Sequence, residues 1–171
     1  MATILTTTYD SVSDTTALTI TLASLATSSG LLVGRETTAV TNVSNMYVDA
    51  MLAGQITTGT TPTTNTQIEV WLYALTKHVA STPTYEYPVT GTDAAITFVA
   101  ETKLTKLVKS WTVNATSNTP YSFSGVSVAA LCGGIMPIKW GLVVIHSTVA
   151  ALNATAGNHW LTYQGIKYTN T

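Results

Sequence analysis

The sequence predicts a single all-β domain, and three observations support this prediction. Threonine supplies 35 of the 171 residues, and its β-branched side chain packs well on a pleated surface. Short runs of alternating apolar and polar residues follow one another between turn residues, and no helical period is sustained. The length is typical of one domain, which at this size buries roughly 70% of its unfolded surface. The chain can therefore form one packed core without disulfides.

The first expected element is an extended arm over residues 1–15, and one domain over residues 16–171 follows it. The segment "ALTITLAS" alternates Leu18, Ile20 and Leu22 with polar residues, which predicts a half-buried strand. Another strand is expected in "NMYVDAMLAGQITTG", before the polar turn region "TTGTTPTTNT".

The segment "QIEVWLYAL" carries the strongest strand signal. As a strand it divides its side chains between two faces of a sheet: Ile68, Val70, Leu72 and Ala74 on one, and Glu69, Trp71, Tyr73 and Leu75 on the other. Residues 77–100 then contain Pro83, Pro88 and Gly91 and are too punctuated for one element. We expect them to form a long excursion between strands, and such loops often make the contacts of a protein.

The second half of the chain predicts further strands. One is expected near residues 105–114, others in "PYSFSGVSVAAL" and "IKWGLVVIHST", and the last in "NHWLTYQGIKYT" after Gly157. Eight or so short strands with uneven loops in one domain favour a β-sandwich, and its jelly-roll form is the expected architecture. The chain has no internal repeat, which disfavours a propeller or a solenoid.

Composition excludes several classes of partner. The formal net charge is −1 and no segment gathers many lysines, so the sequence lacks the basic footprint of a nucleic-acid-binding protein. No window approaches the roughly 18 apolar residues of a membrane span, so no membrane partner is expected.

The chain shows no clear processing signals. No lysine or arginine precedes Arg35, and the start of the chain is not expected to be a signal peptide. The sequons at Asn42, Asn114 and Asn153 are no more than this composition yields by chance.

Arg35 is the single arginine of the chain, and Glu36 follows it directly. Neighbouring residues of a strand point to opposite faces, so the two side chains are expected to meet different partners. We expect Arg35 to bind a carboxylate or a carbonyl-lined turn within its own fold, with Asp49 and Glu69 as candidate acceptors. A contact with a neighbouring subunit and a solvated strand end are the alternatives.

No catalytic, cofactor-binding or metal-binding arrangement is expected, so the chain is not predicted to be an enzyme. The acids are single and scattered, which does not suit a pair of catalytic carboxylates. The three histidines, His78, His146 and His159, lack the spacing of metal ligands. Cys132 has no companion thiol. There is no GxSxG elbow and no phosphate-binding glycine loop.

Two long segments resemble a family of tailed-bacteriophage virion proteins. They are "SGLLVGRETTAVTNVSNMYVDAMLAGQITTGTTPTTNTQIEVWLYA" and "GGIMPIKWGLVVIHSTVAALNATAGNHWLTYQGIKYTN". The resemblance covers most of residues 28–75 and 120–170 and depends on "GRETTA", "GTTPT" with "TQIEVW", and "PIKWG" taken together. Members of the family are described as capsid decoration, cement or auxiliary head proteins with a jelly-roll core. The resemblance implies a homotrimer that binds the outside of the major capsid protein lattice.

The same resemblance implies a location on the capsid surface of the virion, after synthesis in the cytoplasm of the host bacterium. The arm and the excursion at residues 77–100 are the expected contact segments. The aromatic candidates for the interface are Tyr9, Trp71, Tyr73, Tyr85 and Tyr87. The alternative function is a glycan- or receptor-binding module of a phage head or tail fibre, because Glu69 lies beside two of these aromatic residues on one strand face.

Overall fold

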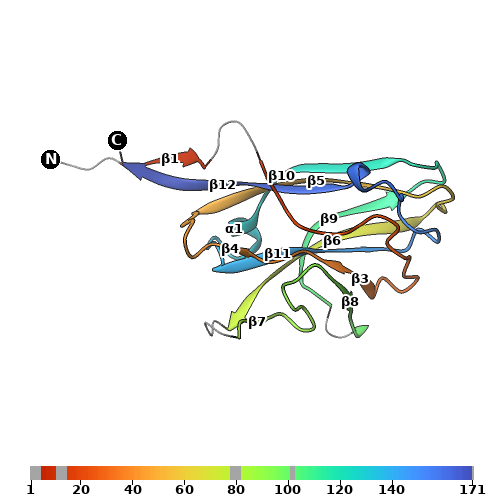
Figure 1. The fold of residues 1–171 in the computed structure, drawn as a ribbon, viewed down its shortest axis with the longest axis horizontal. Helices are drawn as coiled ribbons and strands as arrows, with labels where there is room; N and C mark the ends of the chain where they lie inside the picture. Colours follow the sequence, from red (N-terminus) through yellow and green to blue (C-terminus); the bar gives the residue numbers. More distant parts are fainter. Residues whose placement is uncertain (1–4, 11–14, 78–81, 101–102, 171) are drawn as a thin grey trace.

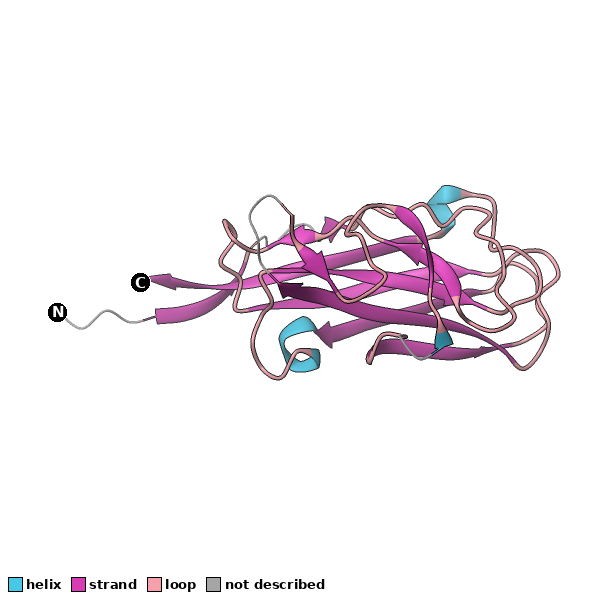
Figure 2. Ribbon diagram, turned by 90° about the horizontal axis from the view of Figure 1, so that it is seen from below, coloured by secondary structure: helices cyan, strands magenta, loops and turns pink. Residues whose placement is uncertain are grey.

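The computed structural model describes residues 5–10, 15–77, 82–100 and 103–170. Strands and the loops between them make up nearly all of these residues. Two curled antiparallel sheets pack face to face (Figure 1 and Figure 2). The prediction of an all-β protein built from packed sheets is confirmed.

The first sheet contains five strands: β1 (Leu5–Tyr9), β2 (Thr16–Ala17), β5 (Asp49–Thr57), β10 (Pro120–Ser127) and β12 (Trp160–Asn170). Their order is β1-β12-β5-β10, and β2 also pairs with β12. β12 pairs with β5 as far as Ile166, and from there its described partner is β1. The two strands thus leave the body of the molecule as a ribbon (Figure 2).

The second sheet contains seven strands: β3 (Val33–Glu36), β4 (Val40–Thr41), β6 (Thr66–Lys77), β7 (Thr84–Tyr85), β8 (Ala94–Thr97), β9 (Lys106–Val113) and β11 (Lys139–His146). Their order is β7-β6-β11-β3-β8, with β9 also paired to β6 and β4 to β11.

Two short helices lie in the connections, α1 (Val128–Leu131) and the 3-10 helix η2 (Ala156–Asn158). The segment "PYSFSGVSVAAL" is therefore β10 followed by α1, and the Ser127 hydroxyl accepts a hydrogen bond from the amide of Ala130 at 2.9 Å. None of the described helices has the length and apolar character that crossing a membrane requires.

The main core lies between the two sheets. β6 contributes Ile68, Val70 and Leu72 to it, all fully buried, as their alternation in the sequence predicts. The other large side chains of this core come from both sheets and include Leu52, Ile56, Trp140, Leu142, Val144 and Leu161.

A second apolar cluster covers the outward face of the second sheet. Tyr73 of β6 and Val143 and Ile145 of β11 form its floor. Its cover comes from residues 85–104, which supply Tyr85, Val89, Ile96, Phe98 and Leu104. Residues 77–100 were predicted to form a long excursion between strands. In the described part, β7 and β8 instead pair with the second sheet, and Tyr85, Val89 and Phe98 pack over its outward face. We call residues 82–100 the cover segment.

Two other expectations also need correction. The predicted arm over residues 1–15 is not seen, because Leu5–Tyr9 is β1 and pairs with β12; residues 1–4 and 11–14 lie outside the described part. The predicted strand around Leu18 and Leu22 is limited to β2, although both side chains are buried. The N–H of Leu18 still binds the carbonyl of Leu161 at 2.8 Å, so this stretch closes one side of the core without extending the sheet.

Candidate interaction surface

Arg35 binds Asp93 of the cover segment. Its Nε donates to Asp93 Oδ1 at 2.5 Å and its Nη2 donates to the Asp93 carbonyl at 2.9 Å. The hydroxyl of Thr21 donates to the other carboxylate oxygen at 2.6 Å. Burial raises the pKa of Asp93, but the hydrogen bonds from Arg35 and Thr21 outweigh it and leave the pKa below its ordinary value. Arg35 thus connects β3, the cover segment and residue 21.

Glu36 binds the cover segment from the opposite face of β3. Its side chain is 1% exposed, and its carboxylate accepts from the amide of Thr90 at 3.0 Å, the Thr90 hydroxyl at 2.8 Å and the amide of Gly91 at 2.9 Å. Adjacent side chains of one strand therefore bind residues 90–93 from two sides, as the alternation of strand side chains allows.

The two acceptors proposed for Arg35 have other partners. Asp49 accepts from the amide of Ala129 at 2.9 Å and from the Ser127 hydroxyl at 2.6 Å, so it holds the start of α1. Glu69 accepts from Trp71 Nε1 at 2.8 Å and from Lys103 Nζ at 2.6 Å. The prediction of Asp49 or Glu69 is wrong because pairing with Asp93 depends on how the cover segment folds back, which strand alternation does not encode.

The aromatic candidates divide into buried and exposed groups. Tyr73 and Tyr85 are 0% and 7% exposed and pack edge to face at 5.5 Å in the second cluster. Both were expected at an interface, and that expectation is wrong because the chain itself covers them. Trp71 is half-buried beneath Lys103, whose Nζ lies 5.0 Å from the ring centre. Tyr9 and Tyr87 remain 50% and 70% exposed.

The described histidine and cysteine side chains form no metal site. Among the described residues no group of three or more His, Cys, Asp or Glu side chains could hold a metal ion; His78 lies outside them. His146 is fully buried, with Nε2 3.0 Å from the Leu25 carbonyl oxygen. Burial lowers the pKa of His146 and of His159, and burial raises the pKa of the Cys132 thiol.

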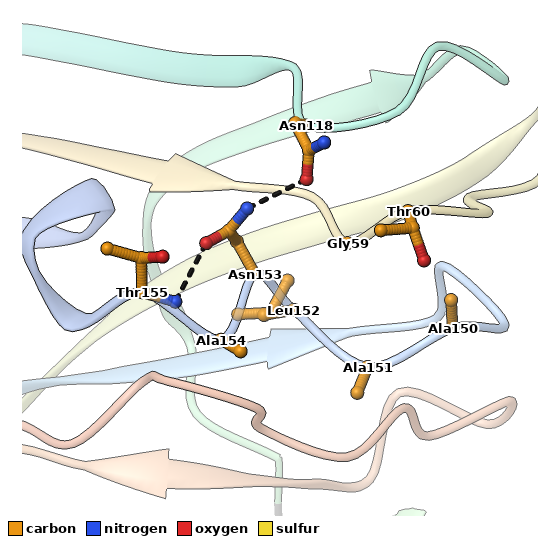
Figure 3. A pocket seen from close by; sticks show the side chains of 9 residues that line it. All are labelled: Gly59, Thr60, Asn118, Ala150, Ala151, Leu152, Asn153, Ala154 and Thr155. Carbon is orange, nitrogen blue, oxygen red and sulfur yellow. Dashed lines mark hydrogen bonds between the residues drawn. The ribbon is translucent and has the colours of Figure 1, made fainter.

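A shallow hollow of about 300 Å³ lies where the loops after β5, β9 and β11 meet (Figure 3). Asn153 lies in its wall and donates from Nδ2 to Asn118 Oδ1 at 2.7 Å, while its Oδ1 accepts from the amide of Thr155 at 2.8 Å. Alanine side chains and Leu152 form much of the rest of the lining. The polar groups of the asparagines are thus used to join the loops, and this hollow offers no charged group for binding.

The outward face of the first sheet is different, because large apolar side chains remain exposed on it. Register places Trp160, Ile166 and Tyr168 of β12 on the side opposite the core residues Leu161 and Tyr163. Pairing adds Met51 of β5 and Tyr9 and Leu5 of β1 to the same side. We call these six residues the open face: Leu5, Tyr9, Met51, Trp160, Ile166 and Tyr168.

The open face is mainly apolar. The exposed fractions are 60% for Leu5, 50% for Tyr9, 57% for Tyr168 and 41% for Trp160. The residues between them on this side are Thr7, Ala53, Gln55, Thr162 and Gln164. At its rim Asp49 uses its carboxylate for α1. Apolar surfaces with exposed aromatic residues are typical of protein contacts. The geometry therefore suits the binding of another protein better than catalysis.

The sequence signal for this surface was present in part. "HWLTYQGIKY" alternates Trp160, Thr162, Gln164, Ile166 and Tyr168 against the core residues, which is a strand with apolar side chains on both sides. Only Tyr9 of the open face was among the predicted interface residues. The rest were missed because the sequence does not tell which of two apolar faces another segment covers.

Comparison of the chain with models of protein families, with curated proteins and with solved structures finds no match.

Proposed function

We propose that the chain is a structural protein of a tailed-bacteriophage virion, a capsid decoration or cement protein that binds the outside of the major capsid protein lattice. The observation that carries the proposal is the open face, where Leu5, Tyr9, Trp160 and Tyr168 stay 41% to 60% exposed and the carboxylate on the same side, Asp49, is bound to α1. A single soluble domain gains nothing for its own stability from such a surface, whereas docking would bury it.

A jelly roll is the proposed form of the two sheets. The strand order β2-β12-β5-β10 faces β3-β11-β6-β9. Successive strands of this set cross between the sheets, except for β6 and β9, which are neighbours in one sheet. That alternation is what a chain produces when it wraps two Greek keys around one core, and it supports the jelly-roll prediction.

The proposed role is non-enzymatic, and the state of the carboxylates supports it. The six acids in the described residues each bind donors of their own fold: Asp10, Glu36, Asp49, Glu69, Glu86 and Asp93. Each is therefore occupied in holding segments together. In the proposed mechanism several copies bind neighbouring capsid subunits, and multivalency strengthens weak individual contacts.

A homotrimer is proposed as the bound form, and sedimentation of the isolated protein tests it. The ribbon of β1 and β12 projects from the body with Leu5, Tyr9 and Tyr168 on one side, and a two-stranded ribbon alone is marginally stable in water. Packing of identical ribbons around a symmetry axis would cover these side chains. A monomer at all concentrations would contradict the trimer but not capsid binding.

Co-sedimentation with capsids that lack the protein tests the main proposal. A variant carrying Trp160→Ser and Tyr168→Ser should lose at least about tenfold in affinity, because each side chain contributes about 1.5–3 kcal/mol when buried. The matched control is Tyr87→Ser, which removes a tyrosine that is 70% exposed on the other side of the molecule. Equal binding by all three proteins, or no binding by the wild type, would contradict the proposal.

A second candidate function, a glycan- or receptor-binding module, is favoured by one observation. Tyr87 is an exposed aromatic residue that borders a hollow together with charged side chains.

A further inference from the structure

A hollow of about 280 Å³ lies on the outer side of the second sheet, away from the open face. Its lining consists of Glu86, Tyr87, Lys103, Leu104 and Thr105. Tyr87 forms an exposed wall, since 70% of it is accessible, whereas Leu104 belongs to the second apolar cluster and is 5% exposed. The hollow therefore has a buried floor and an aromatic edge.

Two ion pairs border this hollow and fix its polar groups. Lys103 Nζ donates to Glu69 Oε2 at 2.6 Å and lies over the ring of Trp71. Lys106 Nζ donates to Glu86 Oε1, and the other carboxylate oxygen of Glu86 accepts from the amide of Ala74 at 3.0 Å. The side chains of both pairs remain 11% to 24% exposed.

These groups keep hydrogen-bonding capacity for a ligand. A lysine ammonium has three donors and a carboxylate has about four acceptor positions, and the contacts just described use only part of them. Each lysine is beside a carboxylate, so donors and acceptors alternate along the rim and their charges cancel. A phosphate or carboxylate ligand would find no unpaired cation here, and a purely apolar ligand would leave the ion pairs without solvent.

We propose that this hollow binds a neutral saccharide. The ring of Tyr87 provides a flat apolar surface for the C–H face of a pyranose, and the Lys103 and Glu86 side chains donate to and accept from neighbouring hydroxyl groups. Concave sites with an apolar wall and a few fixed polar groups are the usual form of small-molecule sites. This proposal rests on the second candidate function and names its ligand class, and it is independent of capsid binding because it uses a different side of the molecule.

Titration of the full chain with oligosaccharides, followed by amide chemical shifts, tests the proposal. The neutral probes are oligomers of glucose, galactose, mannose and N-acetylglucosamine, and the acidic probes are sialyllactose and heparin fragments. We expect at least one neutral oligomer to bind, with shifts centred on residues 86–87 and 103–105. Tyr87→Ala should weaken that binding at least about tenfold, and Tyr87→Phe should preserve it, because the flat ring is retained. Tyr168→Ala is the matched control and should bind as the wild type does.

Three outcomes would overturn the proposal: no binding of any neutral oligomer, binding that survives Tyr87→Ala, or a preference for the acidic probes. A fourth would be loss of capsid binding in Tyr87→Ala without any saccharide binding, which would make the hollow a protein contact. The capsid experiment with Trp160 and Tyr168 is read separately, so either proposal can fail while the other stands.

Discussion

The outward faces of the two sheets differ in how the chain treats them. On the second sheet, Tyr73, Val143 and Ile145 lie beneath residues 85–104 and are fully buried. On the first sheet, Trp160 and Tyr168 face outwards and remain 41% and 57% exposed. Both faces carry apolar side chains, so the difference lies in whether the same chain supplies a cover. The second face therefore contributes to the stability of the fold, and the first is the face on which the proposed function depends.

The cover is held by polar contacts as well as by apolar packing. Arg35 and Glu36, adjacent on β3, bind Asp93 and the Thr90–Gly91 turn from opposite sides. The single arginine of the chain therefore stabilises the closed face. On the side of the open face, Gln55 donates to the carbonyl of Asn158 and Asp49 accepts from the amide of Ala129, but the aromatic side chains there remain exposed.

The largest expected difference in the free energy of unfolding comes from truncating one aromatic residue on each face. Phe98→Ala should lower the free energy of unfolding by about 3–4 kcal/mol, because Phe98 is 2% exposed in the second cluster. Tyr168→Ala on the open face should change it by less than about 0.5 kcal/mol. Urea unfolding of both variants measures this. Similar losses would mean that the two faces do not differ in their contribution to stability.

Removal of the Glu36 carboxylate should have the next largest effect. Glu36→Ala should cost about 2 kcal/mol, because two backbone amides and a hydroxyl lose their acceptor. Hydrogen exchange should show faster exchange at the amides of Thr90 and Gly91 and little change in β12. Glu36→Gln keeps the shape and one acceptor oxygen and should recover part of the loss. Unchanged exchange at residues 90–91 would contradict an anchoring role.

Arg35→Ala should cost about 1–2 kcal/mol, since its ion pair with Asp93 is only partly buried, with side chains 25% and 20% exposed. Arg35→Lys should recover little, because lysine lacks the fork that reaches both the carboxylate and the carbonyl of Asp93. The midpoint of thermal unfolding measures both variants. A loss below about 1 kcal/mol for the alanine variant would reject a structural role for the arginine.

Acidification should lower the free energy of unfolding in two separate steps. Burial depresses the pKa of His146, so the unfolded chain takes up more protons and stability falls as the pH drops below about 6.5. The pKa of Asp93 is also lowered, so its contribution is present above about pH 3.8 and is lost as the pH falls through the folded-state pKa. Urea unfolding from pH 7.5 to 3 measures both steps. Burial also lowers the pKa of His159, so His146→Gln should reduce the first step, and His146→Gln combined with His159→Gln should remove it and leave the second. A first step that persists in the double variant would contradict this assignment.

The sequence predicts the inner side of β6 well and its outer side poorly. Alternation identifies Ile68, Val70 and Leu72 as core residues, and they are fully buried. It also places Tyr73 on the opposite side, but period alone does not say whether water, a partner or the same chain covers that side. A strand with apolar residues on both sides is usually buried on both sides. This pattern in β6, together with the apolar Phe98 in the following segment, could have predicted that the outer side is covered.

The partner of Arg35 was not predictable for a related reason. Asp93 is 58 positions away along the chain, in a segment with little periodicity, and its approach to β3 depends on the pairing of β8. Asp49 and Glu69 lie on strands that alternation does identify, and this made them the more visible candidates. Contacts within strands follow from local pattern, whereas contacts made by a folded-back loop follow from the whole topology.

The pairing of β1 with β12 joins residues that are far apart in the sequence, with Leu5 opposite Asn170. During synthesis β1 is made long before β12, and it has no β12 to pair with while the strands between them are being made. Closing such a long loop is slow compared with forming the neighbouring local contacts. The projecting ribbon therefore forms after the local strand pairs, and the proposed contact surface becomes available only once β12 has been made and has paired.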